Sequence, residues 1–171
     1  MLTPGDPMYN LDRAKEYFTY MAQKHGSKPN MIYEIANEPN GVSWATIKTY
    51  SEQIIPIIRK YDPDAVIIVG TPDFSSFSQQ DTILANRLAD KNVMYTYHFY
   101  AGSHGEGARN NIANLSDKLP IFVTEWGTAW YSGDGANDFN SAQKWVDMMA
   151  TKKISWANWN FSDNPQSGAS F

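Results

Sequence analysis

Two glutamates in this chain stand where chemistry, rather than packing, is expected. Glu38 follows the β-rich run Met31–Asn37, and Pro39 ends that run because proline has no backbone N–H to donate to a sheet. Glu125 follows the apolar residues Ile121–Val123 and the single polar residue Thr124. A carboxylate that enters from a buried strand is costly unless it is paired or functional. Two such groups, one protonated and one ionised, suit acid/base and nucleophilic chemistry on a glycosidic bond.

Other strands also end in polar or aromatic residues. His98 and Tyr100 are two residues apart and therefore point to the same side of their strand. Trp159, at the end of the last strand, offers a flat apolar face for a pyranose ring. Each residue has a simpler interpretation: Asn37-Glu38 as part of a turn, His98 as a core histidine, and the aromatics as packing residues. Together they favour one site, because the carboxyl ends of parallel strands meet on one face.

The elements that would position these residues alternate along the chain. Apolar residues at helical spacing separate five β-rich runs, which predicts right-handed βαβ units and a parallel sheet. Pro56 is expected to kink its helix or end it early. The predicted strands are Met31–Asn37, Ala65–Gly70, Val93–Tyr100, Ile121–Trp126 and Ile154–Phe161. Two helices are predicted to begin after Asn10 and after Ser43. Three more are predicted at Gln79–Ala89, as a weak segment at Ala108–Ser116, and around Ala142–Ala150. A polar loop is predicted at Thr71–Ser78.

Composition restricts the class of protein. The 171 residues suit one domain, residues 1–171, with a real core. A net charge of −4 without a basic stripe argues against a nucleic-acid partner. No apolar run is long enough for a membrane helix, and the first residues lack the features of a signal peptide. Without cysteine and with three scattered histidines, we expect no metal and no cofactor. No phosphate-binding glycine motif is present either.

Four segments follow one another along the chain: Ile32–Gly41, His98–Gly102, Ile121–Gly127 and Trp159–Asp163. In their residues, order and spacing they resemble the family 5 glycoside hydrolases, in particular the bacterial endo-β-1,4-glucanases. The resemblance implies a (β/α)₈ barrel, a retaining mechanism and a β-1,4-glucan substrate. It implies that Glu38 is the general acid/base and Glu125 the nucleophile. By the same resemblance, Asn37 binds the sugar 2-hydroxyl, and His98 and Tyr100 orient the carboxylates. Trp159 forms the floor of the subsite at the cleavage point.

The chain also departs from the family pattern. Phe74 stands where relatives often have a substrate-stacking tryptophan, and Asn164 where they often have a lysine. The segment Leu2–Pro7 resembles the region just after the third barrel strand, so the chain is expected to carry strands four to eight only. The fold expected is therefore a partial barrel of about five parallel strands. Its two end strands would be open edges, and open edges invite association into a homo-oligomer.

Three functions stay open at this stage. The first is a retaining endo-β-1,4-glucanase, favoured by the presence of both glutamates. The second is a β-mannanase or a related β-glycanase, which the motifs do not separate from the first. The third is a catalytically impaired carbohydrate-binding or self-assembling partial barrel, favoured because arginine and histidine residues of the early family strands have no counterpart. The resemblance also implies an extracellular protein.

Overall fold

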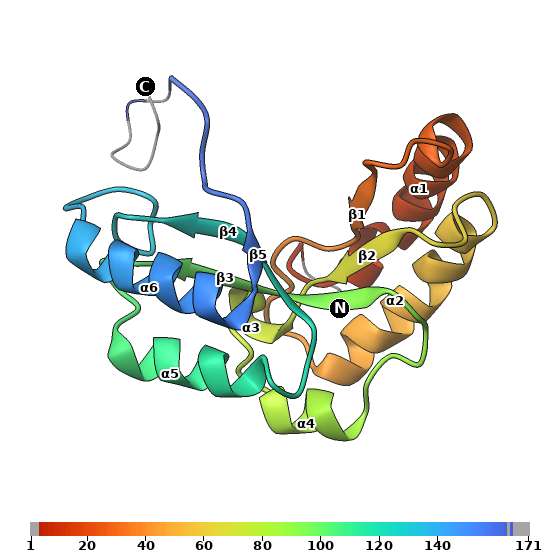
Figure 1. Ribbon diagram of the computed structural model, residues 1–171. Helices are drawn as coiled ribbons and strands as arrows, with labels where there is room; N and C mark the ends of the chain where they lie inside the picture. The colour runs from red at the N-terminus through yellow and green to blue at the C-terminus, as the bar shows by residue number, and fades with distance from the viewer. Residues whose placement is uncertain (1–3, 164, 166–171) are drawn as a thin grey trace. The chain divides into compact units, whose positions relative to one another are not determined.

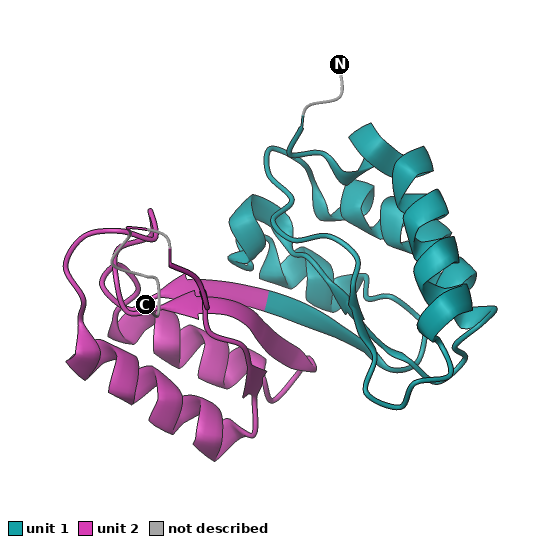
Figure 2. Ribbon diagram, turned by 90° about the horizontal axis from the view of Figure 1, so that it is seen from above, with its two compact units in different colours: residues 1–96 teal, residues 97–171 magenta. Residues whose placement is uncertain are grey.

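The computed structural model describes residues 4–163 and residue 165. The chain divides into two compact units, residues 1–96 and residues 97–171 (Figure 2). Each is built from parallel strands and helices, with strand β3 (Val93–Tyr100) running from the first into the second. The prediction of one domain over the whole chain stays a prediction, because compactness alone does not say what folds independently.

The first unit holds two long helices beside short parallel strands (Figure 1). Helix α1 packs against α2, and β1 pairs with β2, which pairs with the first half of β3. The largest fully buried side chains of its core are Trp44 and six isoleucines, Ile47, Ile54, Ile58, Ile67, Ile68 and Ile83. The elements are η1 (Pro7–Asn10), α1 (Leu11–His25), β1 (Ile32–Glu34), α2 (Trp44–Arg59), β2 (Val66–Val69), α3 (Pro72–Ser75) and α4 (Gln80–Ala85).

The second unit packs two helices side by side, α5 (Glu106–Leu115) and α6 (Phe139–Lys152) (Figure 1). Strand β4 (Ile121–Gly127) pairs in parallel with β5 (Ser155–Trp156). An aromatic stack forms the core: the Phe99 ring centroid lies 3.9 Å from that of Trp145, which is fully buried. The sheet order β1-β2-β3-β4-β5 follows the chain order, which confirms the predicted α/β alternation with parallel strands.

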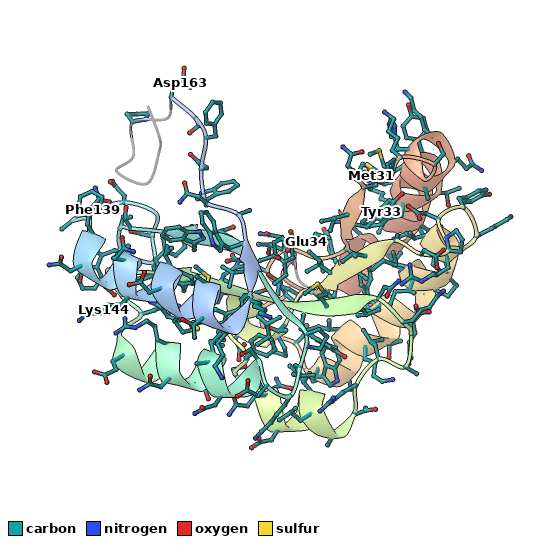
Figure 3. The ribbon with its side chains drawn as sticks, in the orientation of Figure 1. Met31, Tyr33, Glu34, Phe139, Lys144 and Asp163 are labelled. Carbon is teal, nitrogen blue, oxygen red and sulfur yellow. The ribbon has the colours of Figure 1, made fainter. Side chains whose placement is uncertain are left out.

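Two strands are much shorter than predicted, and β2 lacks one predicted residue at each end. The first was expected to reach Asn37 but ends at Glu34 (labelled in Figure 3), and Ile35 N–H makes one more bond, to the Ile68 carbonyl. The last was expected over Ile154–Phe161, yet β5 covers only Ser155–Trp156. Beyond it the backbone makes isolated bonds to β4 and then leaves the sheet, so Phe161 is largely exposed. Periodicity cannot show where pairing stops, because pairing depends on the neighbouring strand.

The helices also differ from prediction in places. Pro56 does not end α2, which continues to Arg59, because its buried face offsets the missing hydrogen bond. Ser43 caps α2, with its Oγ accepting from Thr46 N–H, whereas the Asn10 side chain makes no cap bond to α1. Two boundaries are wrong: α4 stops at Ala85 and α5 begins two residues early, at Glu106.

The segment expected to be a polar loop before α4 contains the short helix α3, in which Asp73 and Phe74 have left-handed backbone angles. None of the described helices combines the length and apolar character needed to cross a membrane.

Candidate functional site

Glu125 lies near the carboxyl end of β4 in the second unit, held by two side chains from β3. The Tyr100 hydroxyl donates to Glu125 Oε1 at 2.5 Å, and His98 Nδ1 lies 3.7 Å from Oε2. His98 is buried and Glu125 is mostly buried. The predicted same-side placement of His98 and Tyr100 therefore brings a phenol and an imidazole to the two oxygens of one carboxylate, which fixes its orientation.

His98 is itself held in place by a residue that sequence reasoning missed. Its Nε2 lies 2.9 Å from Thr124 Oγ1, so the ring is fixed through one nitrogen while the other faces Glu125. The only signal for Thr124 is a polar residue directly before Glu125 in an otherwise apolar strand. His98 is thus a buried histidine with polar neighbours on both nitrogens, not a core histidine packed among apolar groups.

Tyr100 is positioned by a hydrogen bond from its backbone N–H and by the absence of a side chain at Gly127. Its N–H donates to His104 Nδ1 at 2.9 Å, and the His104 carbonyl accepts from the Trp145 indole at 2.8 Å. A Cβ on Gly127 would come within 3.0 Å of the Tyr100 ring, so the glycine gives the ring its place. Neither His104 nor Gly127 was singled out from the sequence for this role.

Trp159 reaches the same end of β4 from the segment after β5. Its N–H donates to the Trp126 carbonyl at 2.8 Å, and the Asn158 amide donates to the same carbonyl at 3.0 Å. The Trp159 side chain is about half exposed. The structure therefore gathers four of the predicted residues in the second unit, Glu125, His98 and Tyr100 in contact and Trp159 at the strand end beside them.

The first unit holds the other predicted residues. Asn37 and Glu38 follow β1, and the Ser75 hydroxyl donates to the Asn37 carbonyl at 2.7 Å. Phe74 N–H donates to the Pro39 carbonyl at 3.1 Å, which places Phe74 beside the Glu38 loop with its ring about half exposed. The Asn164 position lies outside the described residues.

Gly70 allows this loop to approach the end of β2. A Cβ there would lie 2.5 Å from the Ala36 carbonyl oxygen and 2.6 Å from Pro39 Cδ, so any other residue would push the loop away. The close approach, together with the Ser75 bond, fixes the backbone on both sides of Glu38.

Beside Asn37 and Glu38 is a small pocket of about 200 Å³. Tyr50 lines it, and its hydroxyl donates to the Ile35 carbonyl at 2.7 Å. Burial raises the pKa of Tyr50 to about 12, so the hydroxyl stays a neutral donor at neutral pH. Sequence reasoning missed this pocket, whose other polar lining includes Asp6 and Asn10.

The site residues and the fold define a class of protein. The sequence model described as Cellulase (glycosyl hydrolase family 5) matches residues 1–165, and the chain belongs to this family. Its parallel βα units are part of the family's α/β barrel, as the sequence predicted.

Among curated relatives, the chain is 54% identical to Endoglucanase E-5 of Thermobifida fusca and 48% identical to Endoglucanase MaCel5A of Microbulbifer sp. (strain ALW1). The matches cover 100% and 98% of this chain but only 38% and 34% of those proteins. Among solved structures, the catalytic domain of Thermobifida fusca endoglucanase Cel5A in complex with cellotetraose matches with a TM-score of 0.96 and 54% identity. That match covers 100% of this chain and 58% of the solved one. The chain thus spans little more than a third of the length of these curated relatives.

Proposed function

We propose that this chain carries the two catalytic carboxylates of a retaining endo-β-1,4-glucanase. The observation that supports it most is the arrangement at Glu125, where Tyr100 donates to one oxygen and His98 lies beside the other. A nucleophilic carboxylate must present one oxygen to the anomeric carbon, and donors that fix its rotation favour that geometry. Family membership supports the same assignment.

The proposed reaction is a double displacement. Glu125 attacks the anomeric carbon and forms a glycosyl ester, while protonated Glu38 gives its proton to the departing glycosidic oxygen. Glu38, now ionised, takes a proton from water; the water oxygen bonds to the anomeric carbon and the ester bond to Glu125 breaks. The net change is hydrolysis of one glycosidic bond with retention at the anomeric carbon.

Three other residues have proposed roles in holding the substrate. Asn37 holds the sugar 2-hydroxyl, since it directly precedes Glu38 and its backbone is anchored by Ser75. Trp159 supports the sugar at the cleavage point, because its half-exposed ring adjoins the end of β4. Phe74 stacks on the leaving-group side, since its exposed ring is tied to the Glu38 loop.

β-1,4-Glucan is the proposed substrate, and no metal or cofactor takes part in the mechanism. The two curated relatives named above are endoglucanases, and the solved relative binds cellotetraose. A β-mannanase or related β-glycanase is the alternative within the class. Sugar release from carboxymethyl cellulose and from β-mannan, measured side by side, separates the two. From family membership we also infer an extracellular enzyme, which detection of the protein in culture medium would test.

The decisive experiment compares the wild-type chain with Glu125→Gln, Glu38→Gln and the control Glu106→Gln, which changes an exposed glutamate at the start of α5. We expect the first two variants to lose sugar release by at least about 1,000-fold and the control to retain it. A 2-deoxy-2-fluoro glucoside with a good leaving group should label the protein covalently, and peptide mass analysis should place the label on Glu125. Equal release by wild type and Glu125→Gln, or a label elsewhere, would refute the assignment.

A second candidate function is a self-assembling partial barrel with impaired catalysis. It is favoured by apolar exposure on the two strands that end the sheet order: Ile32 on β1 is 49% exposed and Trp156 on β5 is 44% exposed. Unpaired strand edges with such side chains favour association between copies. Light scattering tests this directly: a folded monomer at micromolar concentration contradicts self-assembly, whereas a defined oligomer without sugar release favours it over the enzyme.

A further inference from the structure

The loop after β4 exposes three aromatic side chains within ten residues. Trp130 is 49% exposed, Tyr131 is 72% exposed, and Phe139, the first residue of α6 (labelled in Figure 3), is 69% exposed. None of them has a place in the mechanism above. Leaving large rings in water forgoes the free energy of burying them, so a cluster of exposed rings is typical of a binding surface.

Two of these rings line one open depression. It has a volume of about 490 Å³, and Trp130 and Phe139 contribute its aromatic surface. Asn137 and Asn140 also line it; the Asn137 Oδ1 accepts from the Thr128 hydroxyl at 2.7 Å, which orients its amide N–H₂ group as a donor. Flat apolar rings beside amide groups match a pyranose, which has apolar C–H faces and a rim of hydroxyl groups.

The loop that carries Trp130 is fixed before any ligand binds. A Cβ on Gly135 (φ +100°) would come within 2.9 Å of Trp130 Cδ1, so this glycine lets the backbone pass beside the indole. A fixed platform lowers the entropy lost on binding. Two hydrogen bonds tie the loop to the segment after β3: Gly102 N–H to the Ala129 carbonyl (3.0 Å) and Tyr131 N–H to Ser103 Oγ (2.9 Å). A third, from Asp138 N–H to the Thr128 carbonyl (2.8 Å), joins the two ends of the loop.

Charge at the depression favours a neutral ligand. Among its described lining residues, Asp138 is the only ionisable one, and its Oδ1 accepts from Ser141 N–H at the start of α6. With a carboxylate and no cation in the lining, phosphates, nucleic acids and acidic glycans are disfavoured. An uncharged glycan meets no such penalty.

We propose that this depression is an accessory subsite for β-1,4-linked glucan, with Trp130 and Phe139 as stacking platforms and Asn137 and Asn140 as hydrogen-bonding groups. The identity of the glycan rests on the proposed function. Trp130 is five residues beyond Glu125, and five extended residues span at most about 18 Å, so one oligosaccharide can reach from the carboxylate to the depression. The accessory subsite therefore holds sugar units of the same oligosaccharide that lie beyond the sugar that reacts.

The test measures binding without turnover. Cellohexaose is titrated calorimetrically into the full chain carrying Glu125→Gln, and into the same protein with Trp130→Ala or Phe139→Ala added. We expect each added change to weaken binding by about tenfold, the loss of one stacking contact. Trp130→Phe should retain part of the affinity. The control Tyr20→Ala, which removes a ring of similar exposure (54%) from α1, should stay within twofold of its parent.

The outcomes separate this proposal from the proposed function. Binding within twofold of the parent for both alanine variants, with circular dichroism showing them folded, overturns the accessory subsite, as does a parent that does not bind cellohexaose. Equal binding of maltohexaose with the same dependence on Trp130 overturns the assignment to β-1,4-glucan. A wild-type chain that releases no sugar, yet binds cellohexaose through Trp130, supports the subsite and contradicts the catalytic function alone.

Discussion

The hydroxyl of Tyr100 gives the sharpest prediction about catalysis. Tyr100→Phe removes the donor that meets Glu125 Oε1 at 2.5 Å and leaves the ring beside Gly127 in place. A hydrogen bond to a charged group is worth about 1.5–3 kcal/mol, and about 1.4 kcal/mol corresponds to a tenfold change in rate. If the hydroxyl acts by orienting the carboxylate, sugar release should fall roughly 10- to 100-fold.

The variant should fold almost normally, because the aromatic surface that packs in the core is kept. We expect the free energy of unfolding to fall by no more than the same amount, about 1.5–3 kcal/mol, since this hydrogen bond is all that the substitution removes. The assay is the initial rate of reducing-sugar release from carboxymethyl cellulose, with the rate of labelling by the 2-fluoro glucoside as a second readout. Both rates should fall together, because both depend on attack by Glu125.

Tyr95→Phe is the matched control on the same strand. The Tyr95 hydroxyl accepts from Leu88 N–H at 3.0 Å and has no contact with Glu125 among the described interactions. Its loss should cost stability but leave the rate within about twofold. The reasoning would be refuted if Tyr100→Phe kept the wild-type rate, or if both variants lost the same amount.

Three further predictions concern stability. Burial raises the pKa of Tyr50 from 10.0 to about 12, so the part of the free energy of unfolding that depends on its neutral form is complete below pH 10 and should be lost between pH 10 and 12. Urea titrations should show that Tyr50→Phe, which lacks the bond to the Ile35 carbonyl, loses about 2–3 kcal/mol less free energy of unfolding over that pH range than wild type does. Trp145→Ala should destabilise the chain by about 3–5 kcal/mol in denaturant unfolding, because Trp145 is fully buried in the aromatic stack. Ser75→Ala should lower the free energy of unfolding by about 1 kcal/mol, because the hydroxyl anchors the Asn37 backbone carbonyl. The rate of sugar release should fall by an amount that, expressed as free energy, exceeds this loss of stability. A rate unchanged by this substitution would contradict that role.

Much of the second unit's site could be predicted from sequence because it depends on one strand's alternation. Residues two apart on a strand share a face, so His98 and Tyr100 were expected together, and both contact Glu125. Thr124 and His104 were not expected, because their roles arise from which side chains lie across from them. That neighbourhood depends on strand register and loop path.

The ends of the strands show the same limit. Apolar periodicity predicts that β1 and β5 exist, but the number of paired residues depends on the neighbouring strand, so both end early. Pro56 was expected to disturb α2, and tertiary burial of the same helix outweighs that local preference.

The sequence by itself determined the alternation of parallel βα units, the two glutamates after apolar runs and the resemblance that these motifs carry. These are local properties, set by side-chain type and by spacing along one element. Only the tertiary structure decided that Tyr100 donates to Glu125, that Ser75 anchors the Asn37 carbonyl, and that Trp130 and Phe139 line a common depression. Each joins residues from different elements, and such contacts are fixed by packing and register, which no stretch of sequence contains alone.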